Sequence, residues 1–224
     1  YKAVILSQFG FGATIDFDDV SHKGITNIST DDVAVAQELG YVIKLVGDVR
    51  EVESGISAEV SPTFLPKNHP LASVNDVMNA VFVESIGIGE SMYYGPGAGQ
   101  KPTATSVLAD IIRIARRLSD GNVGKSFNEF RRDLPLANPA DVKSNYYFAL
   151  DTPDEKGKIL HLSEIFNSED ISFEQVLQQK ANGTTARIVV ITHAMSKTQL
   201  KAVTEKLEAA EDFTVVNTLK VLSN

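Results

Sequence analysis

Apolar positions along the chain recur with two different periods. Between residues 103 and 121 they return every three or four positions, ahead of a glycine at 121, which is typical of one face of an amphipathic helix. The apolar residues with this spacing are Val107, Leu108, Ile111, Ile112, Ala115 and Leu118. Between residues 41 and 66, Ile43, Leu45 and Val49 alternate with polar neighbours before the segment SGIS. That alternation predicts a β-hairpin.

The remaining patterns before residue 103 predict one more helix and a further strand pair. Residues 29–40 carry a cap at Ser29 or Thr30, acidic residues in the first turn and Gly40 at the end, so they predict a helix. Residues 79–85 and 87–95 predict two strands around a turn. Residues 1–12 suit either a buried helix or a strand, and their period does not decide. We expect helices on a mostly antiparallel sheet.

Residues 144–224 alternate strands and helices at regular intervals. Strands are predicted at 146–151, 171–180, 186–193 and 213–221, and helices at 156–168 and 196–210. Ser196 and Gln199 form a capping-box pattern at the start of the second helix. The order βαββαβ is the ferredoxin-like arrangement. Such a sheet has a bare face or edge, which favours pairing with a second copy.

The segment before this module lacks a clear period. It contains Pro135 and Pro139, which are typical of a linker. We therefore divide the chain into residues 1–118, a linker at 119–143 and a C-terminal domain at 144–224. The predicted fold class is α+β.

Composition excludes several classes of protein. The 224 residues are 43% hydrophobic and 22% charged, with a net charge of -8 and no cysteine. Basic residues form no long run, so neither nucleic acid nor an anionic membrane is expected as a partner. No apolar run reaches the roughly 20 residues needed to span a bilayer, and we expect a cytoplasmic location. Because the chain begins at Tyr1 rather than methionine, we interpret it as part of a longer protein.

The glycine-rich segment YYGPGAGQKPTATSV, residues 93–107, invites comparison with phosphate-binding loops. A P-loop needs glycine before the lysine and a hydroxyl residue after it, whereas Lys101 lies between Gln100 and Pro102. A dinucleotide fingerprint needs a third glycine where Gln100 stands. Residue types alone leave a tight structural turn and a ligand contact equally open.

Four segments, taken in order, resemble the C-terminal half of homoserine dehydrogenase. They are YKAVILSQFGFG, GITNISTDDVAVAQELGYVIKLVG, PTFLPKNHPLASVNDVMNAVFVES and YYGPGAGQKPTATSVLADII. The last 80 residues are similar to an ACT domain. The resemblance implies a reversible hydride transfer, with NAD or NADP, between L-homoserine and L-aspartate 4-semialdehyde in threonine and methionine biosynthesis. It also implies a nucleotide-binding domain upstream of Tyr1, and it does not decide between the two cofactors.

The resemblance also implies site residues. Lys2 falls on the family's catalytic lysine, whose ammonium can polarise a carbonyl and deliver a proton. Gly97, Ala98 and Gly99 would touch the dinucleotide through their backbone. The helix at 103–118 would return the chain to the nucleotide domain, so its apolar face should be partly exposed.

A regulatory site is expected in the segment DTPDEKGKIL. Asp154 and Gly157 match the family pattern after the first ACT strand, although Lys156 stands where proline is common. The expected ligand is L-threonine at a dimeric interface. No metal site is expected, because the histidines are isolated in the sequence: His22, His69, His161 and His193.

Two classes of function remain open. The chain is either the catalytic and regulatory half of homoserine dehydrogenase, inactive by itself, or a non-catalytic module that binds amino acids and dimerises. A homodimer is expected in both cases.

Overall fold

The computed structural model describes residues 1–122, 124, 130–179 and 184–222. It contains two compact units, one made of residues 1–66 with 131–224 and the other of residues 67–130. Parts of three predicted segments lie outside the described residues: 123 and 125–129 of the linker, 180 of a predicted strand, and 181–183 and 223–224 of the C-terminal domain. The predicted division at residues 118 and 144 stays a prediction.

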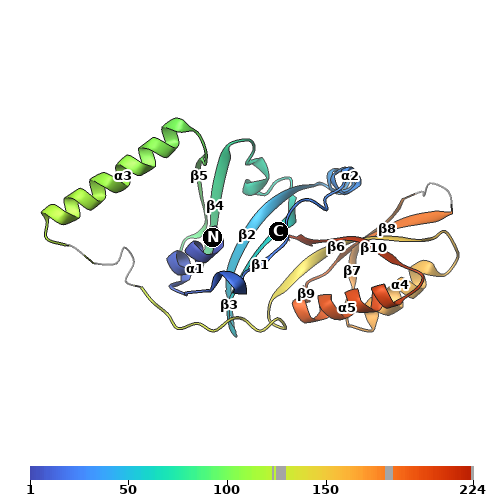
Figure 1. Cartoon of the computed structure of the whole chain (residues 1–224). Coiled ribbons are helices and arrows are strands. Elements are labelled where there is room, and N and C mark those ends of the chain that lie inside the picture. Colours follow the sequence, from blue (N-terminus) through green and yellow to red (C-terminus); the bar gives the residue numbers. More distant parts are fainter. Residues whose placement is uncertain (123, 125–129, 180–183, 223–224) are drawn as a thin grey trace. The chain divides into compact units, whose positions relative to one another are not determined.

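The first unit is built on a sheet of eight strands, counted over the described residues (Figure 1). The strands follow the order β1-β3-β10-β6-β8-β7, with β2 paired to β3 and β9 paired to β6. Their bounds are β1 Ser21–His22, β2 Tyr41–Val52, β3 Gly55–Pro66, β6 Lys143–Pro153, β7 Phe173–Gln179, β8 Thr185–Thr192, β9 Met195–Ser196 and β10 Thr214–Val221. The predicted hairpin is confirmed, since β2 and β3 pair antiparallel from Tyr41–Pro66 to Val52–Gly55.

The C-terminal part of the sheet has the predicted βαββαβ order. Helix α4 (Lys158–Asn167) follows β6, and α5 (Lys197–Ala209) follows β8 and the short β9. Both helices lie on one side of the sheet in Figure 1. The core beneath them includes Phe148, Leu150, Leu162, Phe166, Val190, Val203 and Leu207, all fully buried. Ser196 and Gln199 make both hydrogen bonds of the predicted capping box.

The opposite face of these strands is covered in part by the chain itself. Helix α2 (Thr30–Glu38) packs Val35 and Ala36 against it, in the same cluster as Tyr147 and Val189. The sequence predicted a bare face or edge, and the face is partly covered because α2 shares this apolar cluster. The ring of Phe64 from β3 stacks on Tyr147, with 4.5 Å between ring centroids. Among the described strands, β7 is one open edge of the sheet, and β1, β2 and β9 also pair with a single neighbour.

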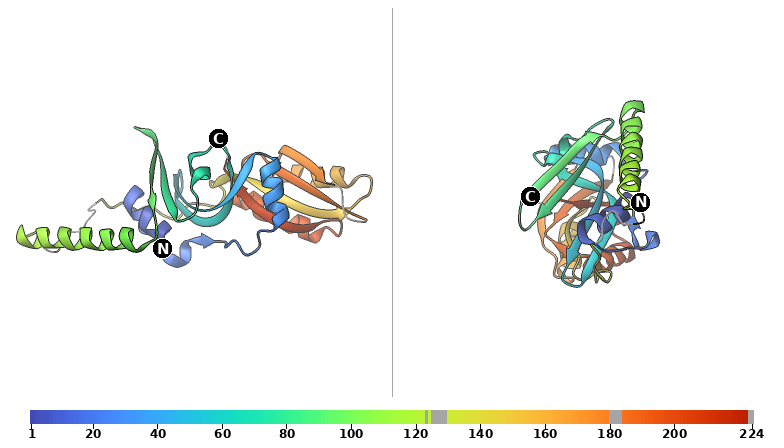
Figure 2. Two further views of the ribbon diagram at one scale, coloured as in Figure 1. Left: turned by 90° about the horizontal axis from the view of Figure 1, so that it is seen from above. Right: turned by 90° about the vertical axis from the view of Figure 1, so that its left-hand side faces the viewer.

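The hairpin and the C-terminal strands form one sheet because β3 pairs with β10. Lys220 and Val221 lie in parallel register with Thr63 and Phe64, and the Leu222 amide donates to the Phe64 carbonyl at 2.9 Å. Figure 2 shows the twisted cyan hairpin strands beside the yellow-to-red C-terminal strands. Two regions predicted as separate domains therefore share their backbone hydrogen bonding.

A buried carboxylate secures α2 to this sheet. Asp32 is 2% exposed and accepts hydrogen bonds from the Ser29 amide at 2.9 Å, the Ser29 hydroxyl at 2.8 Å, the Asn217 amide at 3.0 Å and the Tyr147 hydroxyl at 3.0 Å. Burial by itself raises the pKa of Asp32, but these hydrogen bonds outweigh burial and lower that pKa. Lys23 continues the network by donating to Asn217 at 3.2 Å. A buried carboxylate with four donors is well satisfied.

A second polar cluster lies where β2, β3, β10 and α5 meet. Lys220, which is 6% exposed, contacts both Asp48 and Glu59, and Lys197 lies 2.7 Å from the second oxygen of Glu59. Burial raises the pKa values of Asp48 and Glu59, but the cations together outweigh it and lower both: Lys220 and Arg50 beside Asp48, and Lys220 and Lys197 beside Glu59. Arg50 adds a second cation beside Asp48 and donates to the Lys143 carbonyl at 3.0 Å. Removal of Lys220 would leave each buried carboxylate with one cation, Asp48 with Arg50 and Glu59 with Lys197.

Residues 131–142, within the predicted linker, are bound to the first part of the chain. The Arg132 amide donates to the carbonyl of Gly12, which ends helix α1 (Lys2–Phe11), and its guanidinium binds Glu51 through two contacts of 2.6 Å. The Ile56 amide donates to the Pro135 carbonyl at 2.9 Å. A Cβ at Gly55 would lie 2.0 Å from that carbonyl oxygen, so this approach requires glycine. We call residues 131–142 the strap.

Helix α1 settles the alternative that the sequence left open for residues 1–12. Its buried residues Ala3 and Ser7 face a cluster with Ala13, Ile15 and Ile56. The short 3-10 helix η1 (Phe17–Asp19) follows α1. The rings of Tyr1 and Phe17 stack, with 4.8 Å between their centroids. The sequence period was indecisive because apolar residues occur around much of this short helix.

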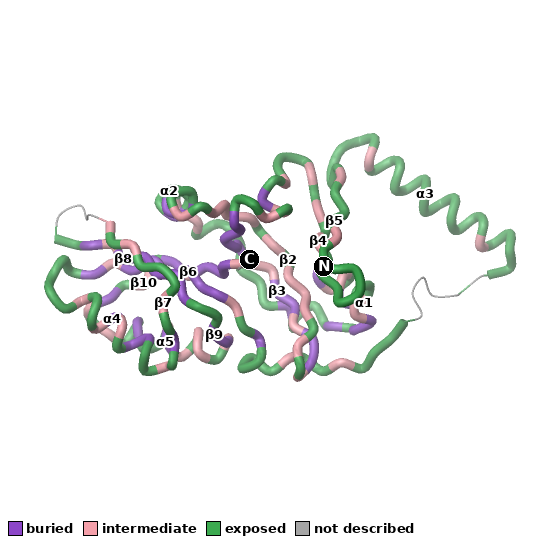
Figure 3. The backbone as a smooth tube through the Cα atoms, turned by 180° about the vertical axis from the view of Figure 1, so that it is seen from behind, coloured by how far each residue is buried: buried purple, intermediate pink, exposed green. Residues whose placement is uncertain are grey.

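The second unit contains a short η2 turn (Pro70–Ser73), the strand pair β4 (Met78–Ser85) and β5 (Gly89–Pro96), and helix α3 (Gln100–Ser119). The strand pair is confirmed as a two-stranded sheet. Helix α3 begins three residues before the predicted start, because Gly99 rather than Thr103 precedes its first turn. The predicted exposure of its apolar residues is confirmed, since each is between 51% and 58% exposed: Val107, Leu108, Ile111, Ile112 and Leu118. Figure 3 shows α3 in green along nearly all its length.

The carboxylates in the two polar clusters predict an acid-sensitive fold. Asp32, Asp48 and Glu59 have lowered pKa values, so the stability that they contribute is complete above the ordinary values of 3.8 and 4.5 and is lost as pH falls through the folded-state values. We expect urea denaturation at pH 7 and pH 3 to show a lower free energy of unfolding at pH 3. Asp32→Asn should cost roughly 1–3 kcal/mol at pH 7 and reduce the acid-induced loss. Equal stability at both pH values would contradict the role of these carboxylates.

Candidate functional site

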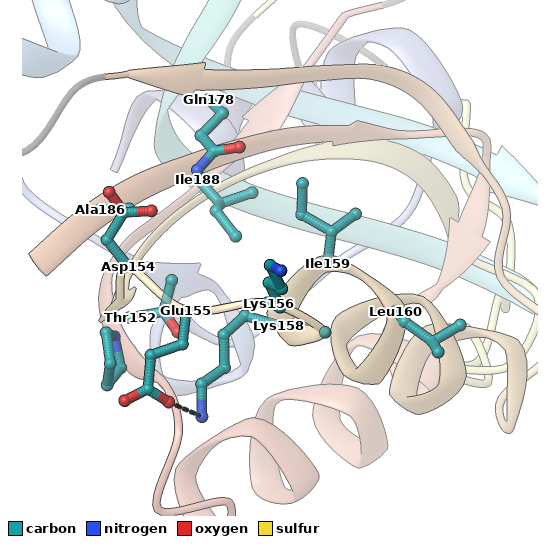
Figure 4. A pocket seen from close by; sticks show the side chains of 12 residues that line it. Thr152, Asp154, Glu155, Lys156, Lys158, Ile159, Leu160, Gln178, Ala186 and Ile188 are labelled. Carbon is teal, nitrogen blue, oxygen red and sulfur yellow. Dashed lines mark ion pairs between the residues drawn. The ribbon is translucent and has the colours of Figure 1, made fainter.

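A pocket of about 290 Å³ lies at the start of α4. Its wall is formed by residues 152–160, together with Gln178 from β7 and Ala186 and Ile188 from β8. Figure 4 shows Ile159 and Ile188 facing the same space, while the carboxylate of Asp154 lies near Ala186 and that of Glu155 points toward Lys158. The predicted regulatory residues Asp154 and Gly157 therefore line one pocket.

The loop at the pocket mouth depends on Gly157. This residue has a φ of 90° and precedes the first turn of α4, where a side chain would be strained even though the surrounding space is open. Gly157 offers no side-chain cap, so the first amides of the ten-residue helix α4 lack a side-chain acceptor at its N-cap. The Asp154 amide donates to the Thr184 carbonyl at 2.9 Å, and this hydrogen bond fixes the part of the loop that precedes Gly157.

The charged side chains at the pocket mouth fall into two groups, those that pair with one another and those that make no ion pair. Lys158 lies 2.5 Å from Asp212 and 3.4 Å from Glu155, and His161 contacts Asp212 at 2.8 Å. The hydrogen bond that Lys158 donates to Asp212 raises the pKa of Lys158, and the hydrogen bonds from Lys158 and then His161 lower the pKa of Asp212. These groups are engaged with one another. Within the described part of the chain, no ion pair within 4 Å is made by Asp154 or Lys156, which also line the pocket.

Lys2 occupies the first position of α1 and is exposed. The helix is held by its buried side, where the Ser7 hydroxyl donates to the Val4 carbonyl at 2.7 Å and contacts the Ala13 carbonyl at 3.1 Å. The chemistry assigned to this lysine requires a site that shields it from water, and the described residues leave it exposed. Its catalytic role stays a prediction.

Gly97 and Gly99 of the glycine-rich turn differ in what a side chain would meet at each position. A Cβ at Gly97 would lie 1.8 Å from the Asn79 side-chain nitrogen, and the Gly97 amide donates to the Val77 carbonyl at 2.9 Å, so Gly97 serves the turn itself. Gly99 has a φ of 121° and is the N-cap of α3, without a side-chain cap. Ala98 and Gly99 are exposed. Open amides at the start of a 20-residue helix fit the polar part of a dinucleotide.

The structure groups only some of the predicted site residues. Asp154 and Gly157 line the same pocket, whereas Lys2 belongs to the first unit and Gly97, Ala98 and Gly99 to the second. Sequence reasoning missed Thr152, Gln178 and Ile188 as pocket residues. The alternation along β6 was the available signal for Thr152, because every second residue from Tyr146 faces the helices.

Two further observations limit the kinds of site. Across the described ranges, no group of three histidine, aspartate or glutamate residues is placed to hold a metal ion. Among the helices described, none has the combined length and apolarity required for crossing a bilayer. His69 instead caps η2, accepting from the Leu71 amide at 3.1 Å.

Comparison with known proteins places these features in a family. A family model described as homoserine dehydrogenase matches residues 1–112, which is half of the chain. The chain is 59% identical over 224 residues to the homoserine dehydrogenase of Lactococcus lactis, covering all of this chain and 52% of that protein. It is 35% identical over 212 residues to the Bacillus subtilis homoserine dehydrogenase, covering 94% of this chain and 49% of that protein.

Solved structures agree with these sequence relationships. The crystal structure of a homoserine dehydrogenase from Thiobacillus denitrificans matches with a TM-score of 0.90 and 30% identity, covering 99% of this chain and 52% of that one. That of the S. aureus enzyme at pH 7.5 matches with a TM-score of 0.68 and 25% identity, covering 100% and 51%. The chain spans about half the length of the curated relatives that it matches. It belongs to the homoserine dehydrogenase family.

Proposed function

We propose that this chain supplies the catalytic lysine and a regulatory module of an NAD(P)-dependent homoserine dehydrogenase. The reaction is the interconversion of L-homoserine and L-aspartate 4-semialdehyde in threonine and methionine biosynthesis, in the cytoplasm. The observation that carries the proposal is the family match over residues 1–112, which includes Lys2 and the turn at Gly97–Gly99.

The proposed chemistry assigns separate tasks to the two units. Lys2 polarises the aldehyde oxygen of the semialdehyde and donates the proton that makes it a hydroxyl, and it accepts that proton in reverse. A bound nicotinamide supplies or accepts the hydride. Ala98 and Gly99 hold the dinucleotide through backbone amides at the start of α3, where helix polarity favours negative groups.

Two surfaces support a role within a larger enzyme. The exposed apolar residues of α3 form a surface that a nucleotide-binding domain would cover. Covering the site with that domain would also remove Lys2 from water, which the chemistry requires. A homodimer is part of the same proposal, because a two-stranded sheet such as β4-β5 is marginal without further packing.

The pocket at the start of α4 is proposed as an amino-acid site of an ACT module. The open amides of α4 suit a carboxylate, and Asp154 suits an ammonium group. L-threonine, an end product of the pathway, is the proposed ligand. A non-catalytic binding and dimerising module is the second candidate function, favoured by the exposure of Lys2.

An assay of homoserine-dependent dinucleotide reduction distinguishes the two candidate functions. We expect the 224-residue chain alone to show no homoserine-dependent reduction of NAD or NADP, and a full-length enzyme with this sequence to show it. In that enzyme, Lys2→Ala should lower kcat by roughly 100-fold or more, because a general acid contributes at least that factor. Dinucleotide affinity should change little, since Lys2 acts on the substrate.

The matched control is Lys201→Ala, which removes a lysine whose side chain is 79% exposed on α5. Its kcat should equal that of the parent enzyme. A Lys2→Ala enzyme with the parental kcat would remove Lys2 from catalysis, and a full-length enzyme without activity would favour the binding module.

The assembly state is tested on the chain itself. We expect sedimentation at micromolar concentration to show a dimer or a larger species, because β4-β5 and the open β7 edge both offer surfaces for a second copy. A single species of 24.3 kDa would contradict the dimer.

A further inference from the structure

One residue of the pocket differs from its neighbours on the same strand. Along β6, the residues that face α4 and α5 are Tyr146, Phe148, Leu150 and then Thr152. Thr152 is 2% exposed, and its hydroxyl oxygen has no hydrogen-bond partner among the described residues. A buried hydroxyl without a partner destabilises the folded state. Thr152 therefore retains a polar atom where an apolar side chain would be more stable.

The neighbours of Thr152 on β8 are apolar, and Gln178 from β7 is the polar side chain that the sheet adds to the pocket wall. Thr152 pairs with Ala186 on β8, two residues from the Leu150–Ile188 pair, and Ala186 and Ile188 are buried residues that also line the pocket. Figure 4 shows Thr152 on the sheet side of the pocket, with α4 opposite. The charged residues of the mouth belong to the loop that follows. A hydroxyl at this depth has no protein partner to satisfy, which points to a group that enters the pocket.

We propose that Thr152 determines the specificity of the pocket by hydrogen bonding to a hydroxyl on the side chain of the bound amino acid. This inference rests on the proposed amino-acid site. The ligand carboxylate lies at the open start of α4 and its ammonium group beside Asp154, which makes no ion pair within 4 Å among the described residues, so that its side chain points toward the sheet. The pocket then selects small hydroxylated amino acids over aliphatic ones of the same shape.

The geometry permits this contact without loss elsewhere. Rotation of Thr152 about its first side-chain bond by one rotamer moves the hydroxyl to the position of the methyl group and the methyl to that of the Cβ hydrogen, and it breaks no hydrogen bond because the hydroxyl makes none among the described residues. The volume of about 290 Å³ is at the small end for ligand pockets, which excludes large side chains. A site that hydrogen-bonds a ligand hydroxyl discriminates strongly against a ligand that lacks it.

The test compares L-threonine with L-valine, which differ by a hydroxyl in place of a methyl group. Isothermal titration calorimetry on the 224-residue chain should give a dissociation constant for L-threonine about tenfold lower than for L-valine, as expected for one hydrogen bond. Thr152→Val should remove this preference, and Thr152→Ser should keep it. Gly157→Val should abolish binding of both amino acids, because a β-branched residue disfavours positive φ.

Thr218 provides the matched control. Its hydroxyl is the other buried one without a partner in the described residues, but Thr218 lies on β10 opposite Phe148 and does not line the pocket. Thr152→Val and Thr218→Val should both raise the Tm of the free chain, because each removes an unsatisfied hydroxyl. Only Thr152→Val should change the ratio of the two dissociation constants.

Three results would overturn the inference. They are equal affinities of the parent chain for L-threonine and L-valine, a preserved preference in Thr152→Val, and binding that survives Gly157→Val. Absence of binding by either amino acid would overturn both the inference and the amino-acid site. None of these results bears on the dehydrogenase assignment, because homoserine-dependent dinucleotide reduction measures that independently.

Discussion

The pairing of β3 with β10 is the constraint on which the first unit depends. It involves few residues, since only Thr63 and Phe64 lie in register with Lys220 and Val221. Yet Phe64 is fully buried and stacks on Tyr147, and Lys220 is the cation between Asp48 and Glu59. Backbone pairing, aromatic packing and a buried ion cluster thus coincide at one strand junction. Because each of these is costly to break in part, the junction is expected to open as a whole.

This junction links the helix that carries Lys2 with the module that carries the pocket. The strap adds a second connection, since it binds the end of α1 through Gly12 and the start of α5 through the Lys197 amide, which donates to Pro139 and Val142 carbonyls. In the proposed enzyme, a ligand beside Gly157 therefore acts on a module that shares its sheet and its strap with the support of the catalytic lysine. No flexible spacer separates the described residues 131–142 from the hairpin.

Local signals in the sequence predicted helices and strands, but they could not predict contacts between residues far apart in the chain. The cap at Ser29 or Thr30, the capping box at Ser196 and the three-to-four spacing in α3 identified helices correctly, because caps and amphipathic faces depend on nearby residues. The β3–β10 pairing was not predicted, since two paired residues far apart in the chain leave no periodic pattern. The strap was interpreted as a linker because its contacts use backbone groups around Pro135 rather than an apolar period. For the site, the family pattern led to Asp154 and Gly157, whereas the unsatisfied hydroxyl of Thr152 becomes visible only when its neighbours in space are known.

Native-state hydrogen exchange in increasing urea tests most directly whether the supports of Lys2 and the pocket form one cooperative unit. The amides to compare are those of Leu65 in β3 and of Phe148 and Leu150 in β6, all of which belong to buried residues. The account predicts that they converge on one opening free energy with one urea dependence, because β3 cannot separate from β10 without opening the apolar cluster that joins Phe64 to Tyr147 and Val221. Exchange of the β3 amides through a much lower opening free energy, while the β6 amides remain protected, would show two independent folding units and contradict the account.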